Sequence, residues 1–161
     1  MDKEVFAVDY DDCLVPFQDA FKTWLRDTHG HDLCQHTPVL GKFHYDEVFP
    51  DSGIAADSFS RFIDQYTEEA SIDTAPYEGV HEALVELAEL YELHIVTARA
   101  PKYRAITEQA AEKYFGSNVF EAVHTAEFTG NHKETSKVSM YRHIGATATV
   151  DDADHNINAA V

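Results

Sequence analysis

The regular alternation of helical and strand-like segments from residue 76 onward most constrains the fold. Apolar residues recur at helical spacing over residues 80–91 and 102–115, and short apolar runs occupy residues 94–97, 119–125 and 146–150. Such alternation is typical of a parallel sheet with helical crossovers. Residues 5–8 add a further buried strand, which stops at Asp9. We therefore expect an α/β fold, with a Rossmann-like parallel sheet core flanked by helices.

The first two predicted strands lie too far apart in the sequence for one crossover. Between them, residues 17–25 and 59–66 show the apolar spacing of amphipathic helices, whereas prolines and glycines interrupt residues 31–53. We therefore predict an α/β core made of residues 1–14 and 76–161. Residues 15–75 are predicted to form a small, mostly helical insertion after the first strand.

The charge of the chain restricts its partners. The 161 residues include 29 acidic and 12 basic side chains, a net charge of −17 with histidine neutral. This balance disfavours nucleic acids and anionic membrane surfaces, and it fits cation binding or a high-salt environment. The sequence has no apolar run long enough to span a membrane, no signal-peptide pattern and only two cysteines. We expect a cytoplasmic protein that acts on a small molecule.

Polar residues follow three of the predicted strands. Asp9 and Asp11 follow the first, Thr97 the second, and Asp151 and Asp152 the last. The carboxyl ends of parallel strands form the usual ligand site of such sheets. Carboxylates gathered there repel one another by about 4 kcal/mol per pair at 4 Å, and a cation relieves this repulsion. Oxygen ligands in small number suit Mg²⁺.

The same residue types can carry out phosphoryl transfer. A carboxylate can attack phosphorus, and a second carboxylate two residues along can act as general acid and then as general base. A hydroxyl and an ammonium, for which Thr97 and Lys137 are available, would hold the transferring phosphoryl oxygens.

Together these residues resemble the four motifs of the haloacid dehalogenase-like superfamily of phosphotransferases. The first motif is similar to residues 8–14 (VDYDDCL), the second to residues 95–99 (IVTAR) and the fourth to residues 150–157 (VDDADHNI). The third motif is a lysine, for which Lys137, 14 residues before Asp151, fits better than Lys133. All four occur in order, and the resemblance covers nearly the whole chain.

The resemblance implies a role for each matching residue. Asp9 would be the nucleophile that forms an aspartyl-phosphate, and Asp11 the acid/base. Thr97 and Lys137 would bind the phosphoryl group. Mg²⁺ would be held by Asp9, by the backbone carbonyl of Asp11 and by Asp152, with Asp151 bonded to metal-bound water. The family places a helical C1-type cap between its first two motifs, where this chain has its insertion.

Within the family, this chain is most similar to the 5′-nucleotidase (deoxyribonucleotidase-like) branch. The similarity lies in the pattern Asp-x-Asp-Asp-x-Leu, an aromatic residue three positions later, and Thr-Ala-Arg. It implies nucleoside monophosphates as substrates, although phosphatases of sugars and other small esters share the core motifs. The predicted substrate contacts are Phe17, Ala98, Arg99 and Tyr45, with Phe43 and His44 as weaker candidates. Phe17 is equally compatible with apolar packing, and Arg99 with a surface or helix-capping role.

Several alternatives remain open at this stage. The chain could be a catalytically idle module that binds a metal or phosphate and acts through a partner. A polynucleotide 3′-phosphatase would share the core motifs, but the excess of acidic residues leaves no obvious basic surface for DNA. His29, His31, Cys34 and His36 could ligate Zn²⁺, or they could form a polar loop.

The end of the chain leads to a last expectation. Members of the family usually continue past the fourth motif with a helix and a fifth strand, whereas this chain ends nine residues after Asp152. We expect an exposed apolar sheet edge, which a second copy of the chain could cover in a homodimer.

Overall fold

The computed structural model describes residues 3–42, 44–126 and 136–153. The chain divides into two compact units, one made of Met1–Pro16 and Ala75–Val161 and the other of Phe17–Thr74. We refer to the first as the α/β unit and to the second as the helical unit.

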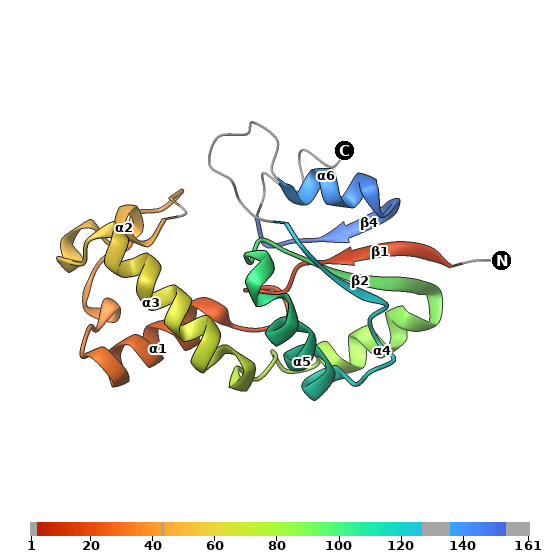
Figure 1. The fold of residues 1–161 in the computed structure, drawn as a ribbon, viewed down its shortest axis with the longest axis horizontal. Helices are drawn as coiled ribbons and strands as arrows, with labels where there is room; N and C mark the ends of the chain where they lie inside the picture. Colours follow the sequence, from red (N-terminus) through yellow and green to blue (C-terminus); the bar gives the residue numbers. More distant parts are fainter. Residues whose placement is uncertain (1–2, 43, 127–135, 154–161) are drawn as a thin grey trace. The chain divides into compact units, whose positions relative to one another are not determined.

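A parallel sheet forms the centre of the α/β unit (Figure 1). Its described strands are β1 (Glu4–Val8), β2 (Tyr91–Thr97), β3 (Ala122–Thr125) and β4 (Ala146–Val150), in the order β3-β2-β1-β4. Val8 pairs with Ile95 on one side and with Val150 on the other, so the three strands end at the same edge. The α/β fold predicted from the sequence is confirmed.

Helices cover both faces of this sheet. They are α4 (Val80–Leu90), α5 (Arg104–Phe115) and α6 (Ser136–His143), with a 3₁₀ turn at Pro101–Tyr103 before α5. Figure 1 shows α6 on one face and α4 and α5 on the opposite face. Tyr141 of α6 packs with Ala7 and Val96, and all three are buried. Burial on both faces explains why residues 5–8 of β1 form an apolar run without alternation, whereas β2 also carries Glu92 and His94.

Two predicted boundaries in this unit are wrong. Tyr91 is not part of a helical face but the first residue of β2, where it pairs with Glu4 of β1. Pairing along the whole of β1 extends β2 toward its amino end. The strand predicted from residue 119 begins only at Ala122, which pairs with His94, and residues 117–119 form a turn.

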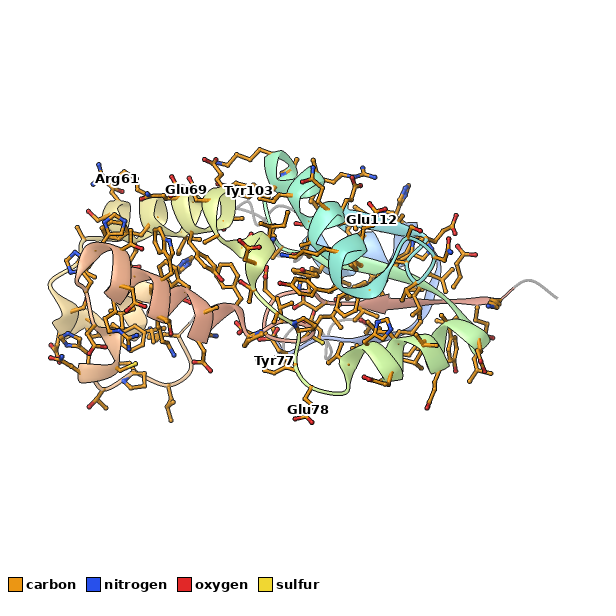
Figure 2. The ribbon with its side chains drawn as sticks, turned by 90° about the horizontal axis from the view of Figure 1, so that it is seen from below. Arg61, Glu69, Tyr77, Glu78, Tyr103 and Glu112 are labelled. Atoms are coloured by element: carbon orange, nitrogen blue, oxygen red, sulfur yellow. The ribbon has the colours of Figure 1, made fainter. Side chains whose placement is uncertain are left out.

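The helical unit contains α1 (Phe17–His29), α2 (Tyr45–Val48) and α3 (Ala56–Glu69), with 3₁₀ turns at Leu33–Gln35, Pro50–Ser52 and Ser71–Asp73. Helix α1 is followed by Gly30, whose φ of +76° favours glycine. The core of the helical unit contains the buried side chains of Phe21, Phe59 and Tyr66. Arg61 and Glu69 point outward from α3 (Figure 2). None of the described helices is both long and apolar enough to cross a membrane.

Replacement of Phe21 by alanine tests the core of the helical unit. The Phe21 side chain is fully buried, so we expect the substitution to lower the free energy of unfolding by about 3–5 kcal/mol through lost contacts and an internal cavity. Urea unfolding of Phe21→Ala beside Thr23→Ala, an exposed position of the same helix, measures this loss. Equal midpoints for the two variants would contradict the packing described.

Candidate active site

A tight loop after β1 places Asp9 at the carboxyl end of the sheet. The Asp9 backbone N–H donates to the carbonyl of Val150 (2.9 Å), which joins the ends of β1 and β4. Beyond it, the Asp12 N–H donates to the Val15 carbonyl (2.8 Å), and the Val15 N–H donates back to the Tyr10 carbonyl (3.2 Å). Asp12 has a φ of +58°, which lets the chain reverse here.

The ammonium of Lys137 lies between two carboxylates at this edge. Its Nζ is 2.6 Å from Asp9 Oδ2 and 3.0 Å from Asp151 Oδ2. Tyr141, one turn after Lys137 on α6, donates from its hydroxyl to Asp151 Oδ2 at 2.7 Å, and the Ala153 N–H donates to Asp151 Oδ1 at 2.9 Å. Asp9, Lys137 and Asp151 are all buried.

Burial is the largest influence on the pKa values of Asp9 and Lys137. It raises the pKa of Asp9 from 3.8 to about 8; Lys137 lowers the pKa, whereas Asp151 and Asp11 raise it. Burial alone would lower the pKa of Lys137, but Asp9 and Asp151 raise it above its usual value, so the ammonium stays charged. One lysine therefore does not fully compensate this group of carboxylates, and a further cation would favour the ionised form of Asp9.

Cys13 lies near the same acidic residues, and its surroundings disfavour the thiolate form. Burial raises the pKa of its thiol to about 12, and Asp9, Asp152 and Asp151 add to the shift. At neutral pH the side chain is therefore a protonated thiol, whereas the reactive form of cysteine is the thiolate.

Three carboxylates are arranged so that they could hold a metal ion. Asp9, Asp151 and Asp152 each offer an oxygen, and these oxygens lie within 4.8 Å of one another. Asp9 and Asp151 are buried, while Asp152 is exposed. Hard oxygen donors that leave room for water and substrate suit Mg²⁺. Asp11 is not in this group, and its predicted backbone contribution to the metal stays a prediction.

Thr97 is fully buried at the carboxyl end of β2, where its Oγ1 accepts a hydrogen bond from the Arg99 N–H at 3.3 Å. The next residue, Ala98, is exposed. Their predicted contacts with phosphate and substrate stay predictions. Two lysines were considered for the third motif. Lys137 contacts Asp9, whereas Lys133 lies outside the described residues. Residues 154–157 of the fourth motif also lie outside the described residues.

Arg99 has a partner that the sequence did not indicate. Its guanidinium binds the carboxylate of Asp11 through two bonds, from Nε to Oδ2 (2.8 Å) and from one terminal nitrogen to Oδ1 (2.7 Å). Arg99 is buried, and 88 residues separate it from Asp11. The sequence-based choices for Arg99 were a substrate contact, a surface position or a helix cap, and this ion pair belongs to none of them.

The predicted substrate contacts of the insertion lie in the aromatic core of the helical unit. Phe17 stacks on Phe21 with ring centres 6.3 Å apart and meets Tyr66 edge-on at 5.2 Å. Tyr45 packs edge-on against Phe21 at 5.0 Å. Phe43 lies outside the described residues, and His44 is exposed. Apolar packing of Phe17 is therefore observed, and contact with a nucleobase stays a prediction.

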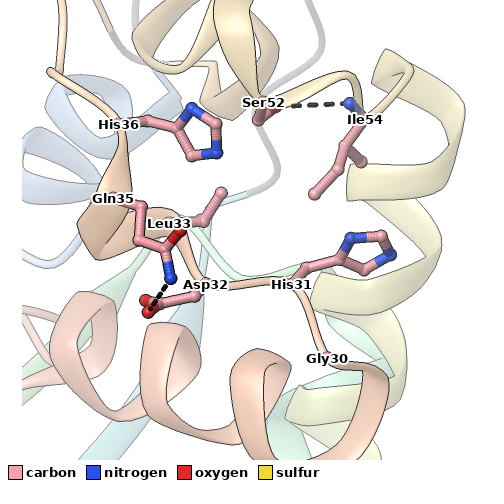
Figure 3. A pocket seen from close by; sticks show the side chains of 8 residues that line it. All are labelled: Gly30, His31, Asp32, Leu33, Gln35, His36, Ser52 and Ile54. Carbon is pink, nitrogen blue, oxygen red and sulfur yellow. Dashed lines mark hydrogen bonds between the residues drawn. The ribbon is translucent and has the colours of Figure 1, made fainter.

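In the described structure, the His and Cys side chains of the histidine-rich segment do not gather into one close group. The His29 ring packs on Phe62 at 4.5 Å and bonds to Gln65, and Cys34 is exposed. His31 and His36 lie on different sides of a hollow of about 210 Å³ (Figure 3). Asp9, Asp151 and Asp152 are the one close group of three or more acidic, histidine or cysteine side chains in the described part of the chain. His29 is the last residue of α1, and Cys34 belongs to the 3₁₀ turn Leu33–Gln35.

Comparisons with known proteins identify the fold. No protein-family model and no curated protein sequence matches the chain. Among solved structures, a haloacid dehalogenase-like family hydrolase of Streptococcus pneumoniae is similar over 98% of this chain and 80% of its own, with 15% identity and a TM-score of 0.66. A predicted phosphatase of Clostridium acetobutylicum is similar over 99% and 81%, with 16% identity and a TM-score of 0.64.

YfnB of Bacillus subtilis, solved with magnesium bound, is similar over 99% of both chains, with 14% identity and a TM-score of 0.50. The chain therefore has the fold of the haloacid dehalogenase-like hydrolases. The carboxylates of Asp9, Asp151 and Asp152 lie at the carboxyl ends of β1 and β4.

Replacement of Lys137 by methionine tests the buried ion group. The substitution leaves Asp9 and Asp151 without their shared counter-ion, so we expect the free energy of unfolding to fall by about 3–5 kcal/mol. Urea unfolding at neutral pH without divalent cations measures the change. Lys113→Met, at an exposed position of α5, is the control, and a comparable loss there would contradict the assignment.

Replacement of Asp152 by asparagine tests the metal site. Loss of one charged oxygen ligand should weaken Mg²⁺ binding by at least about tenfold. Calorimetric titration with Mg²⁺ compares Asp152→Asn with Glu112→Gln, which neutralises an exposed carboxylate on α5 (Figure 2). An Asp152→Asn affinity equal to that of the control would place the ion elsewhere.

Proposed function

We propose that this protein is a Mg²⁺-dependent phosphomonoester hydrolase that acts through an aspartyl-phosphate on Asp9. The observation that carries the proposal is the convergence of Asp9, Lys137 and Asp151 at the strand ends, with Asp152 close by. A nucleophile, a fixed cation and a place for a metal are what phosphoryl transfer requires.

The proposed reaction has two steps. A carboxylate oxygen of Asp9 attacks phosphorus, the bond from phosphorus to the ester oxygen breaks, and Asp11 gives that oxygen a proton. A water molecule then attacks the phosphorus, Asp11 takes its proton, and the bond to Asp9 breaks to release inorganic phosphate. Mg²⁺, when bound by Asp9 and Asp152, supplies positive charge that favours ionised carboxylates and offsets charge on the phosphoryl oxygens.

Lys137 is suited to hold both the nucleophile and the substrate. An ammonium has three N–H donors, and in the described part of the chain Asp9 and Asp151 take two of them. The third is available to a phosphoryl oxygen. Thr97 is proposed to bind another phosphoryl oxygen, on the strength of its place at the end of β2 beside β1.

The proposed substrate is a small phosphorylated metabolite, and nucleoside monophosphates are favoured by the similarity of the first two motifs to the nucleotidase branch. Phe17 and Tyr45 are proposed as contacts from the helical unit, which would act as the cap, and Ala98 as a contact from the loop after β2. The net charge of −17 supports small esters over polynucleotides. Sugar phosphates are the second substrate class to test.

Phosphate release from a panel of nucleoside monophosphates and sugar phosphates tests the proposal. We expect release by the wild type with Mg²⁺, none with EDTA, and a loss of at least about 10⁴-fold in Asp9→Asn, because the amide is not a nucleophile. Asp57→Asn, an exposed carboxylate of α3, should retain full activity. Release by Asp9→Asn at the wild-type rate would overturn the assignment of the nucleophile.

A further inference from the structure

Arg99 is fixed in place by groups on three sides. Two of its nitrogens bind the two oxygens of Asp11 at 2.8 and 2.7 Å. The remaining terminal nitrogen donates to Thr107 Oγ1 at 3.1 Å, and the guanidinium carbon lies 4.9 Å from the centre of the Tyr10 ring. Side-chain exposure is 5% for Arg99 and 24% for Asp11, so the cation is buried and the carboxylate is partly open to solvent.

The acceptor on α5 is itself held in place. The Thr107 hydroxyl donates to the Tyr103 carbonyl at 2.9 Å, which leaves its oxygen free to accept from Arg99. Thr107 is fully buried. The planar guanidinium therefore has one orientation, and that orientation dictates the orientation of the Asp11 carboxylate, because a two-bond pair fixes both partners in one plane.

This pairing leaves the Asp11 carboxylate able to accept further hydrogen bonds. Each carboxylate oxygen has two lone pairs, and the two bonds from Arg99 use one on each oxygen. Among the residues that the structure describes, one lone pair per oxygen remains for a proton or a water molecule. An acid/base group without such a fixed partner would rotate about its side-chain bonds and spend little time aimed at the ester oxygen.

We infer that Arg99 is a positioning residue that aims the Asp11 carboxylate at the leaving-group oxygen and at the attacking water. This inference rests on the proposed function, and it assigns Arg99 a role through Asp11 in place of a contact with the substrate. The guanidinium touches no reacting atom in this role; it fixes the group that does.

Two esters with different leaving groups test the inference. Nitrophenolate leaves without a proton, whereas an alkoxide needs one from Asp11. We compare kcat/KM for p-nitrophenyl phosphate and for the best alkyl phosphate of the substrate panel. We expect Arg99→Ala to lower kcat/KM for the alkyl ester by about 10- to 100-fold and for the aryl ester by less than about threefold.

Three further measurements separate positioning from other roles. Added guanidinium should restore part of the alkyl-ester activity of Arg99→Ala. In an Asp11→Asn background, Arg99→Ala should cause no further loss, because both changes remove the same function. Arg104→Ala removes an exposed arginine that pairs with Glu108, and it should leave both esters unchanged.

Each outcome decides between defined alternatives. An equal loss on both esters, a change in KM alone, or losses that add to those of Asp11→Asn would overturn the inference; a change in KM alone would identify a substrate contact. If Arg99→Ala does not fold, Arg99→Lys, which keeps the charge but not the fork, must show the same selective loss on the alkyl ester. A wild type that hydrolyses neither ester overturns the proposed function and this inference with it.

Discussion

The ammonium of Lys137 between Asp9 and Asp151 is the interaction on which the rest of the site depends. Two buried carboxylates at one sheet edge repel each other, and the cation between them offsets part of this repulsion. The lysine reaches this position because α6 covers the sheet face next to β1 and β4, and Tyr141 fixes the second carboxylate from the same helix. The fold therefore constrains the chemistry of the site before any ligand binds.

The sequence predicted most of this arrangement because β1 and β4 end directly before Asp9 and Asp151, and β2 ends at Thr97. The α/β fold and the meeting of Asp9 with Asp151 both follow from that pattern. Lys137 could be chosen over Lys133 from its spacing alone. The start of β2 at Tyr91 could not be predicted, because it depends on pairing with the full length of β1.

Other features of the site depend on packing between segments that are far apart in the sequence. The spacing of apolar residues along the chain does not predict such contacts. The pair of Arg99 with Asp11 requires Thr107 of α5 and the Tyr10 ring to hold the guanidinium, and only the folded chain brings them together. Tyr141 left a weak signal, since it lies four residues after Lys137 and so shares its helix face. The histidine-rich segment shows the reverse case. Its His and Cys residues are close in sequence and suggested a zinc site, but their side chains do not gather in the described structure.

Chemical trapping of the intermediate tests the central claim most directly, because it reports which atom accepts the phosphoryl group. The protein is mixed with substrate and Mg²⁺, quenched during turnover and treated with borohydride, which reduces an acyl-phosphate to an alcohol. Peptide mass spectrometry then examines residue 9. The account predicts homoserine in place of Asp9, and only when substrate was present. Hydrolysis of the substrate without this product, or with reduction at another carboxylate, would contradict it.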